Sequence, residues 1–204
     1  TDCLEAMKQY KDNHFDLAIV DPPYGINQDK GISYGKYARE VHKAKNWDNK
    51  IPSKEYFEHL RRISKNQIIW GGNYFIDYLS STRCMLVWDK KNGTNPMSDC
   101  ELAWTSFDSS VRKFTWHHFS GYMSKSHKYC RWHPSQKPVA LYSWILKKYA
   151  FKGAKILDTH LGSGSICIAV LHHKELKIDL TGFEIDEEYY NNIIKRINAF
   201  KGSK

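Results

Sequence analysis

One stretch near the C-terminal end constrains the fold of this chain more than any other. Residues 154–157 are a short apolar run typical of a strand, 158–165 (DTHLGSGS) are a glycine-rich turn, and 166–172 are an apolar segment of helical length. Residues 177–183 then predict a second strand. Strand, turn, helix and strand in this order predict a βαβ unit with two parallel strands in an α/β fold.

The turn of this unit predicts a nucleoside ligand. Gly162 and Gly164 permit a tight turn and a close approach of the backbone to a ligand. Glu184 directly follows the second strand, where an acid can accept hydrogen bonds from both hydroxyls of a ribose. The turn lacks the third glycine of the dinucleotide fingerprint, and the sequence has no Gly-Lys-Ser/Thr phosphate loop. S-adenosylmethionine therefore suits the unit, because it has a ribose and an amino-acid carboxylate but no pyrophosphate.

A polar turn before another helix predicts where that carboxylate binds. Apolar residues recur at helical spacing after Pro138, so a helix is expected to begin near it. Ser135 and Lys137 lie just before this helix and would donate hydrogen bonds to a carboxylate at its N-terminus. A simple loop with a helix cap is the alternative interpretation.

The tetrapeptide Asp21-Pro22-Pro23-Tyr24 is the second informative feature. It follows the apolar run 15–20, a predicted buried strand that the prolines end abruptly, so Asp21 is expected at the strand's carboxyl end. Open α/β sheets keep their ligands there. The Asp21 carboxylate and the Pro22 carbonyl would accept both hydrogens of an exocyclic amine, while the Tyr24 ring stacks on a planar base. The alternative is a plain turn with a solvated aspartate and a core tyrosine.

The remaining pattern predicts a single domain over residues 1–204. Its other expected elements are a helix over 2–10, a helix over 52–65 with Pro52 in the first turn, and strands over 67–70 and 84–88. Residues 101–106 and 114–119 are expected to pair at a sheet edge, because no helix-length segment separates them. In the last helix Asp186 is the expected cap, and the expected core face consists of Tyr190, Ile193, Ile194 and Ile197.

The charge of the chain favours a polyanionic partner. Its 31 Lys and Arg residues against 22 Asp and Glu give a net charge of +9 and a pI near 9.2. Cations and aromatic rings are interleaved in two segments, 25–50 and 107–133, and this combination suits phosphates and bases. A mobile, solvated loop is the alternative for 25–50. The residues expected to contact nucleic acid are Lys36, Arg39, Lys43, Arg112, Lys125, Lys128 and Arg131.

Cysteine usage favours reduced thiols in a cytoplasmic protein. The chain has five cysteines and no C-x-x-C pair. Cys130 and His133 have metal-like spacing, but no second ligand pair is evident, so no metal site is predicted. No apolar run approaches the length of a bilayer span, and no targeting segment is evident.

These motifs closely resemble those of the β-class DNA amino-methyltransferases, in which D-P-P-Y precedes the cofactor motif. The motifs that carry the resemblance are 16–24 (DLAIVDPPY), 87–90 (VWDK), 101–104 (ELAW), 133–138 (HPSQKP), 158–165 and 182–184 (GFE), and they cover nearly the whole chain. The resemblance implies that the catalytic residues are Asp21, Pro22, Pro23 and Tyr24. The cofactor-binding residues that it implies are Ser135, Lys137, Asp158, Thr159, His160, Gly162, Ser163, Gly164, Ser165 and Glu184.

The chain departs from the family in the cofactor turn, which commonly reads D-P-F-x-G-S-G-T. Thr159, His160 and Ser165 replace the usual residues, and His160 would take the place of an aromatic wall. The first catalytic position, by contrast, follows the N6-adenine enzymes, because it is Asp21 where N4-cytosine enzymes usually carry Ser.

The resemblance implies a permuted Rossmann-like methyltransferase fold: a mostly parallel seven-stranded sheet with an antiparallel edge hairpin and helices on both faces. The implied activity is transfer of a methyl group from S-adenosylmethionine to the N6 amine of an adenine flipped out of double-stranded DNA. Methylation of cytosine N4 in DNA, methylation of RNA adenine, and an inactive DNA-binding homologue are the alternatives. A homodimer that shares the DNA and a cognate restriction endonuclease are left open as partners, and no membrane is implied.

Overall fold

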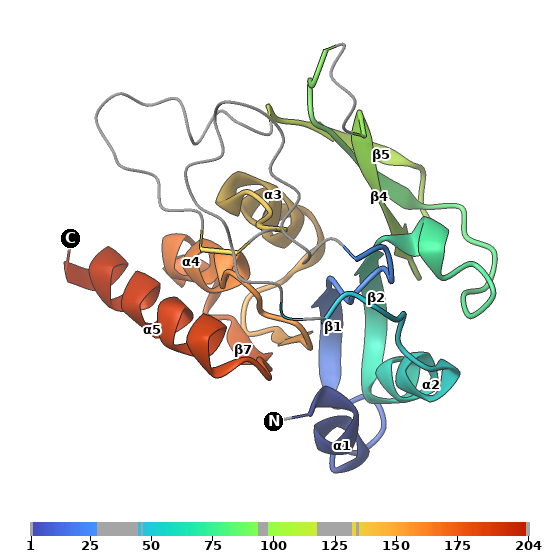
Figure 1. Cartoon of the computed structure of the whole chain (residues 1–204), viewed down its shortest axis with the longest axis horizontal. Helices are drawn as coiled ribbons and strands as arrows, with labels where there is room; N and C mark the ends of the chain where they lie inside the picture. The colour runs from blue at the N-terminus through green and yellow to red at the C-terminus, as the bar shows by residue number, and fades with distance from the viewer. Residues whose placement is uncertain are drawn as a thin grey trace.

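The structure is a computed structural model that describes residues 2–27, 45, 47–93, 98–117, 132–133 and 135–202 (Figure 1). Within these residues the strands form one seven-stranded sheet in the order β5-β3-β4-β2-β1-β6-β7. The strands are β1 (Phe15–Val20), β2 (Ser64–Trp70), β3 (Met85–Asp89), β4 (Cys100–Thr105), β5 (Arg112–Thr115), β6 (Lys155–Asp158) and β7 (Asp179–Gly182). The helices are α1 (Cys3–Lys8), α2 (Lys54–Ile63), α3 (Val139–Tyr149), α4 (Ser165–His172) and α5 (Glu187–Gly202), with 3-10 turns η2 (Gly72–Tyr74) and η3 (Lys174–Leu176).

The strands of this sheet run in one direction, with the exception of β4. Strand β1 is parallel to β2 and β6, and β6 is parallel to β7. Strand β4 is antiparallel to β2 and β3, while β5 is parallel to β3 at the far edge. The chain leaves β1 toward β2 and later returns to β6 on the other side of β1. The border between β1 and β6 is thus a topological switch point, where such sheets bind ligands. The mostly parallel sheet with one antiparallel hairpin is confirmed.

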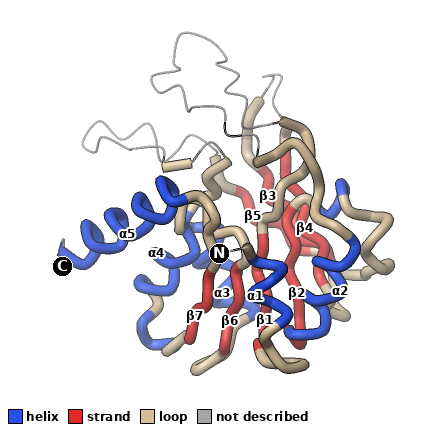
Figure 2. Tube along the Cα trace, turned by 60° about the horizontal axis from the view of Figure 1, so that its bottom comes forward, coloured by secondary structure: helices blue, strands red, loops and turns tan. Residues whose placement is uncertain are grey.

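Helices cover both faces of the sheet (Figure 2). On one face α3 and α4 pack on the strands, and Ile145 lies in the same core cluster as Ile19. On the other face α1 and α2 pack on the strands, and Phe57 shares a cluster with Val20. Because side chains alternate along a strand, the neighbours Ile19 and Val20 face opposite layers. Both faces are therefore filled, and the carboxyl ends of the parallel strands remain for a site.

The expected pairing of residues 101–106 with 114–119 is wrong. Strands β4 and β5 lie on opposite sides of β3, so Leu86 is opposite Ala103 of β4 and Arg112 of β5. The antiparallel hairpin is formed by β3 and β4. Since β4 ends and β5 begins beside the start of β3, the short connection only has to pass across that start, and no crossover helix is needed.

Helices α2 and α3 begin close to the expected prolines. Ser53 is the N-cap of α2, so Pro52 precedes the first turn and does not lie in it as expected. The helix expected near Pro138 is α3, and Pro138 is its N-cap. In both cases the proline stands at the entrance of the helix, where its fixed φ and missing N–H do no harm.

The core face of α5 differs from the expected one. Tyr190 and Ile194 are 50% and 40% exposed, whereas Tyr189 and Ile193 are buried. The sequence offers two adjacent apolar stripes, and contact with the glycine turn before α4 selects the one that contains Ile193. Asp186 caps the helix as expected, because its carboxylate accepts a hydrogen bond from the backbone N–H of Tyr189 at 3.0 Å.

Four cysteines lie in the described part of the chain, and none of them forms a disulfide there. Cys130 lies outside the described residues. Burial raises the pKa of Cys3 to about 11 and that of Cys167 to about 12, so both thiols stay protonated and are poor nucleophiles. None of the described helices combines the length and the apolar character of a bilayer span.

Candidate active site

The two predicted motifs meet at one edge of the sheet. Strands β1 and β6 are parallel neighbours (Figure 2), with Ala18 opposite Leu157, so their carboxyl ends lie side by side. Asp21 follows β1 directly, and Asp158 is the last residue of β6. Lys137, which precedes α3, reaches Asp21 with its ammonium group. Segments far apart in the sequence therefore converge on one site.

Asp21 is held by two donors from different parts of the chain. The Tyr24 hydroxyl donates to Oδ1 at 2.6 Å, and the Lys137 Nζ lies 2.5 Å from Oδ2. The side chain of Asp21 remains 15% exposed. Each carboxylate oxygen has further acceptor capacity, so Asp21 can still bind a donor from a ligand. Pro22 is buried beside it and Pro23 is partly buried.

Asp48 fixes the backbone of Tyr24 and Gly25, which follows Asp21 and the two prolines. Its Oδ1 accepts hydrogen bonds from the backbone N–H groups of Tyr24 at 2.7 Å and Gly25 at 2.9 Å. Its own carbonyl accepts one from the N–H of Asn27 at 2.8 Å. Asp48 is only 1% exposed. Sequence patterns did not point to it, because a single aspartate in a basic segment belongs to no motif.

The ring of Tyr24 contacts Gly71, which follows β2, and Tyr74 of the 3-10 turn η2. It stacks on Tyr74 of η2, with ring centroids 4.8 Å apart and planes inclined by 15°. Gly71 has a φ of +73° and lies against the Tyr24 ring, where a Cβ would collide with Cε1. Tyr74 is 41% exposed. A planar base can therefore stack on this face of Tyr24 only when the Tyr74 ring moves away far enough to leave a gap between the two rings.

Asp21, Lys137, Glu101 and Lys90 form a partly buried row of alternating charges. Lys137 Nζ lies 3.0 Å from Glu101 Oε2 as well as 2.5 Å from Asp21, and Lys90 Nζ lies 2.7 Å from Glu101 Oε1. Lys90 follows β3, and Glu101 lies at the start of the antiparallel β4, which brings it to the same edge as Asp21. The motifs VWDK and ELAW contain Lys90 and Glu101, but only the sheet topology brings them together.

Burial and charge oppose one another within this row. Burial raises the pKa of Asp21, and the ammonium of Lys137 acts in the opposite direction. For Glu101 the effect of burial is outweighed by Lys137 and Lys90, which lower its pKa to about 2. Burial disfavours the charged form of Lys137, but Asp21 and Glu101 keep its pKa above the ordinary lysine value. Lys137 is thus an ammonium ion.

Side chains of α5 pack against the glycine turn between β6 and α4 and donate hydrogen bonds to it. Gly162 and Gly164 have φ values of +50° and +68°. A Cβ on Gly164 would lie 2.8 Å from Ile193, so glycine is needed for close packing as well as for the turn. Arg196 donates to the Ser163 carbonyl at 2.7 Å and to the Ser165 hydroxyl at 3.1 Å.

Two carboxylates flank the turn. Glu184 accepts hydrogen bonds from the backbone N–H groups of Gly162 at 2.8 Å and Asp186 at 2.9 Å, and burial raises its pKa. Asp158 accepts one from the N–H of His160 at 3.0 Å, yet burial raises its pKa to about 7. Among the described residues, no three His, Cys, Asp or Glu side chains converge as a metal site requires.

The unusual residues of the turn join a chain of buried polar groups. The Tyr56 hydroxyl lies 2.6 Å from Thr159 Oγ1, which lies 2.9 Å from His160 Nδ1. His160 Nε2 lies 3.9 Å from the sulfur of Cys3. Burial lowers the pKa of His160 to about 4, so its ring is neutral at pH 7. Thr159 and His160 are therefore accommodated by contacts with α1 and α2.

The two residues expected to bind a carboxylate have different surroundings. The Ser135 hydroxyl lies 2.9 Å from His133 Nδ1 and is partly exposed. Lys137 is 4% exposed, and its ammonium contacts Asp21 and Glu101. Ser135 remains available at the N-terminal side of α3, whereas Lys137 is engaged by the acidic side chains.

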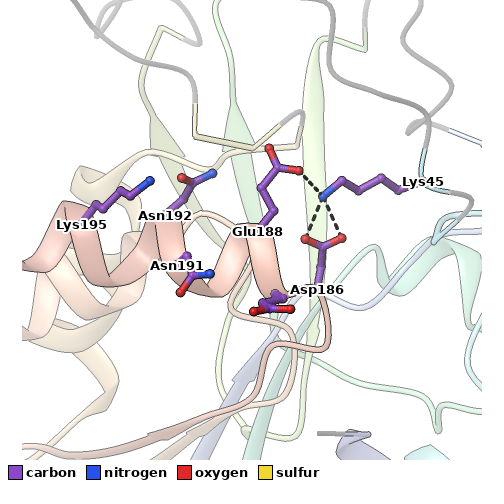
Figure 3. A pocket seen from close by; sticks show the side chains of 7 residues that line it. Lys45, Asp186, Glu188, Asn191, Asn192 and Lys195 are labelled. Atoms are coloured by element: carbon purple, nitrogen blue, oxygen red, sulfur yellow. Dashed lines mark hydrogen bonds and ion pairs between the residues drawn. The ribbon is translucent and has the colours of Figure 1, made fainter.

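Six of the seven residues expected to contact nucleic acid lie outside the described residues: Lys36, Arg39, Lys43, Lys125, Lys128 and Arg131. Arg112 is exposed on the edge strand β5. Lys45 belongs to the 25–50 segment and is described. Its Nζ lies 2.7 Å from Asp186 and 2.8 Å from Glu188, so Lys45 pairs with the start of α5 (Figure 3).

A pocket of about 500 Å³ beside Lys45 is lined by this lysine and the first turns of α5 (Figure 3). Its lining consists of charged and amide side chains. A nucleoside pocket needs an apolar or aromatic wall for the base, so the nucleoside site is not assigned to it.

The raised pKa of Asp158 predicts a pH-dependent stability. The folded chain holds a proton on Asp158 up to about pH 7, whereas the unfolded chain releases it near pH 3.8, so stability falls as pH rises between these values. Asp158→Asn is expected to raise the free energy of unfolding at pH 8 by roughly 2–4 kcal/mol. At pH 5 the gain should fall to less than half.

Denaturant unfolding at both pH values tests this. Asp179→Asn, at an exposed position of β7, is the matched control and should show no such pH-dependent gain. An equal gain for Asp158→Asn at pH 5 and pH 8 would mean that Asp158 does not titrate as stated.

The chain is similar to known methyltransferases over nearly its whole length. The type II methyltransferase M.HpaI of Haemophilus parainfluenzae is 24% identical over 244 residues, which cover 98% of this chain and 73% of that protein. The putative methylase YubD of Escherichia coli K12 is 22% identical and is matched over 97% of this chain and 88% of its own length.

Solved structures and a family match agree with these relatives. The complex of M1.HpyAVI with S-adenosylmethionine has a TM-score of 0.60 and 19% identity, with 97% of each chain covered. The cytosine-N4-specific PvuII DNA methyltransferase has a TM-score of 0.62 and 10% identity, covering 99% of this chain and 89% of its own. At these identities the likeness shows a shared fold. The DNA methylase family matches residues 69–196, more than half of the sequence, and the chain belongs to this family.

Proposed function

We propose that this protein transfers a methyl group from S-adenosylmethionine to the N6 amine of an adenine in double-stranded DNA. The proposal is carried by the convergence of Asp21, an acceptor held by two donors, with the glycine turn and Glu184 at neighbouring strand ends. Membership of the DNA methylase family supports methyl transfer to DNA.

The groups around the turn fit S-adenosylmethionine, which supplies a methyl group on a sulfonium sulfur when bound. Glu184 lies beside the turn, where it accepts hydrogen bonds from the backbone N–H groups of Gly162 and Asp186, and its carboxylate would take the ribose hydroxyls. Asp158 is a buried carboxylate whose charged form is disfavoured, and the ammonium group of the cofactor would restore that charge. Ser135 would donate to the carboxylate of the cofactor.

Asp21 and the Pro22 carbonyl would activate the adenine amine, which is a weak nucleophile. The lone pair of the adenine amine is delocalised into the ring. Hydrogen bonds from the amine to the Asp21 carboxylate and the Pro22 carbonyl would stabilise a more tetrahedral nitrogen whose lone pair attacks the methyl carbon in line. The nitrogen would gain the methyl group, whose bond to sulfur breaks to leave a neutral thioether, and Asp21 would take one proton from the nitrogen and pass it to solvent.

The target base would have to leave the duplex, because its amine cannot reach Asp21 while it is stacked. Unstacking costs a few kcal/mol, and stacking on Tyr24 offsets part of it. The segments 25–50 and 107–133 would hold the phosphate backbone and contact neighbouring bases. Of the seven residues expected to contact nucleic acid, Arg112 on β5 is the one that the structure describes.

Cytosine N4 is the second candidate target. The PvuII enzyme, whose fold this chain shares, is cytosine-N4-specific. Both bases present an exocyclic amine that Asp21 and the Pro22 carbonyl could accept. Adenine is preferred because an aspartate stands in the first catalytic position, where the N4-cytosine enzymes usually carry serine.

Incubation of the protein with tritium-labelled S-adenosylmethionine and unmethylated duplex DNA tests the proposal. Label should enter the DNA, and mass spectrometry of the digested nucleosides should give N6-methyladenine. N4-methylcytosine would instead establish the second candidate. Binding of DNA without cofactor binding or label transfer would identify an inactive homologue. Label transfer to RNA alone would show that the substrate is RNA and not DNA.

Tyr74 is expected to matter for base flipping, because it occupies the face of Tyr24 that a base would use. The base should enter between the two rings, so Tyr74→Ala should lower turnover about tenfold or more through lost stacking, while Tyr74→Phe stays near wild type. Fluorescence of 2-aminopurine at the target position reports the flipped base. Tyr190→Ala, at an exposed position of α5, is the control, and unchanged flipping in Tyr74→Ala would contradict the prediction.

A further inference from the structure

We propose that Lys137 is a positioning residue that keeps the Asp21 carboxylate ionised for methyl transfer, and that Glu101 holds Lys137 in place. This inference rests on the proposed function, since it concerns the charge of the amine acceptor. It starts from the row Asp21–Lys137–Glu101–Lys90, in which each ammonium lies within 3.0 Å of its acidic neighbours. The four residues come from four separate parts of the sheet edge.

Such a row is costly as a purely structural device. Taking a charge out of water costs several kcal/mol per ion, and apolar side chains of similar size could fill the same space. The side chains of Lys137 and Lys90 are 3% and 8% exposed, while those of Asp21 and Glu101 are 15% and 23% exposed. The lysines are thus more deeply buried than the acids.

The chemistry requires a charged Asp21. Only the ionised carboxylate accepts both an amine hydrogen and the Tyr24 hydroxyl without competing as a donor. Burial by itself favours the neutral acid, and the positive charge of Lys137 at 2.5 Å counteracts it. Glu101 acts on Asp21 in the opposite sense, because it is a second negative charge.

Lys137 has no freedom to turn away from Asp21. Its Nζ also contacts Glu101 and donates to the Tyr24 hydroxyl at 3.2 Å, and it lies over the rings of Tyr24 and Trp70 at 5.6 and 5.4 Å. Three acceptors match the three N–H groups of an ammonium. Glu101 therefore anchors Lys137 in place while also balancing its charge.

The groups that act on Asp21 come from each neighbouring element. They are the Tyr24 hydroxyl after β1, Lys137 before α3, Glu101 on β4, Tyr142 on α3, Tyr56 on α2 and Asp158 at the end of β6. Asp158 titrates near pH 7 and would act on cofactor binding. Turnover measured at saturating cofactor and DNA separates the titration of Asp21 from that of Asp158.

The test compares the pH dependence of kcat in wild type, Lys137→Met and Glu101→Gln. In Lys137→Met the acid limb of the kcat profile, which reports protonation of Asp21, should move upward by about one to three pH units. The reason is that a neighbouring opposite charge lowers a carboxyl pKa by that amount. In Glu101→Gln it should move downward, because a like charge is removed while the amide oxygen can still bind Lys137. Lys54→Met, at an exposed position of α2, should keep the wild-type profile.

Opposite shifts in the two variants support the inference, since damage to the fold would not move the limb in both directions. An unchanged limb in either folded variant overturns it. If Lys137→Met does not fold, Glu101→Gln decides: a downward shift supports the inference and an unchanged limb overturns it. An inactive wild type would refute the proposed function itself, whereas an active wild type with unshifted variants would refute this inference alone.

Discussion

Asp21→Ala is expected to lower the rate of methyl transfer by about a thousandfold, while the affinity for S-adenosylmethionine changes by less than about threefold. The carboxylate is the acceptor that acts on the amine nitrogen, whereas the groups proposed for the cofactor are Asp158 at the end of β6, Glu184 after β7 and Ser135 before α3. Single-turnover transfer of labelled methyl groups measures the rate, and calorimetry measures the affinity. Asp108→Ala, at a side chain that is 78% exposed, is the control and should leave both unchanged.

The same substitution should also destabilise the fold, and this has to be separated from catalysis. Removing Asp21 leaves the buried ammonium of Lys137 with one acid fewer, which is expected to cost about 3–5 kcal/mol. The double variant Asp21→Ala/Lys137→Met removes both charges and should recover much of this stability without recovering activity. Methyl transfer at near wild-type rate by either protein would show that Asp21 is not the acceptor.

Glu184→Ala is expected to weaken binding of S-adenosylmethionine by about 10- to 100-fold. Hydrogen bonds to a charged acceptor contribute about 1.5–3 kcal/mol each, and the variant loses those proposed for the ribose hydroxyls. It also leaves the N–H groups of Gly162 and Asp186 without this acceptor, which loosens the turn. Turnover at saturating cofactor should change much less than affinity, because Glu184 does not touch the reacting atoms in this proposal.

Calorimetric titration with S-adenosylmethionine tests the role of Glu184. Glu188→Ala is the matched control, since its side chain is 67% exposed on the next helix and pairs with Lys45. Glu184→Gln keeps one acceptor oxygen and should fall between wild type and Glu184→Ala. Equal affinity for S-adenosylmethionine in wild type and Glu184→Ala would show that Glu184 does not bind the ribose.

The fold was predictable where the sequence carries local signals. Apolar runs that end at Asp21 and at Asp158 predicted the strands β1 and β6, because a buried strand and a turn each leave a short-range pattern. The pairing of β4 and β5 was not predictable in this way. Both strands are amphipathic enough to pair with each other, and their common neighbour β3 became evident only in the sheet.

The site was predictable in part for the same reason. Asp21 and Glu184 each stand at the end of a strand pattern, so their positions at the sheet edge followed from local structure. Asp48 and Tyr74 carry no such signal. Their contacts with the backbone and ring of Tyr24 depend on where the 45–50 segment and η2 lie in space.

By itself the sequence determined the strand ends, the glycine turn and the residue types that a methyl transfer to an amine would use. These depend on side-chain periodicity and on backbone restrictions that act over a few residues. Only the tertiary structure decided that Lys137 contacts Asp21 and Glu101 instead of standing free before α3. The physical reason is that a buried charge is stable only beside opposite charges, and the strand order of the sheet, which no local pattern encodes, fixes which charges meet.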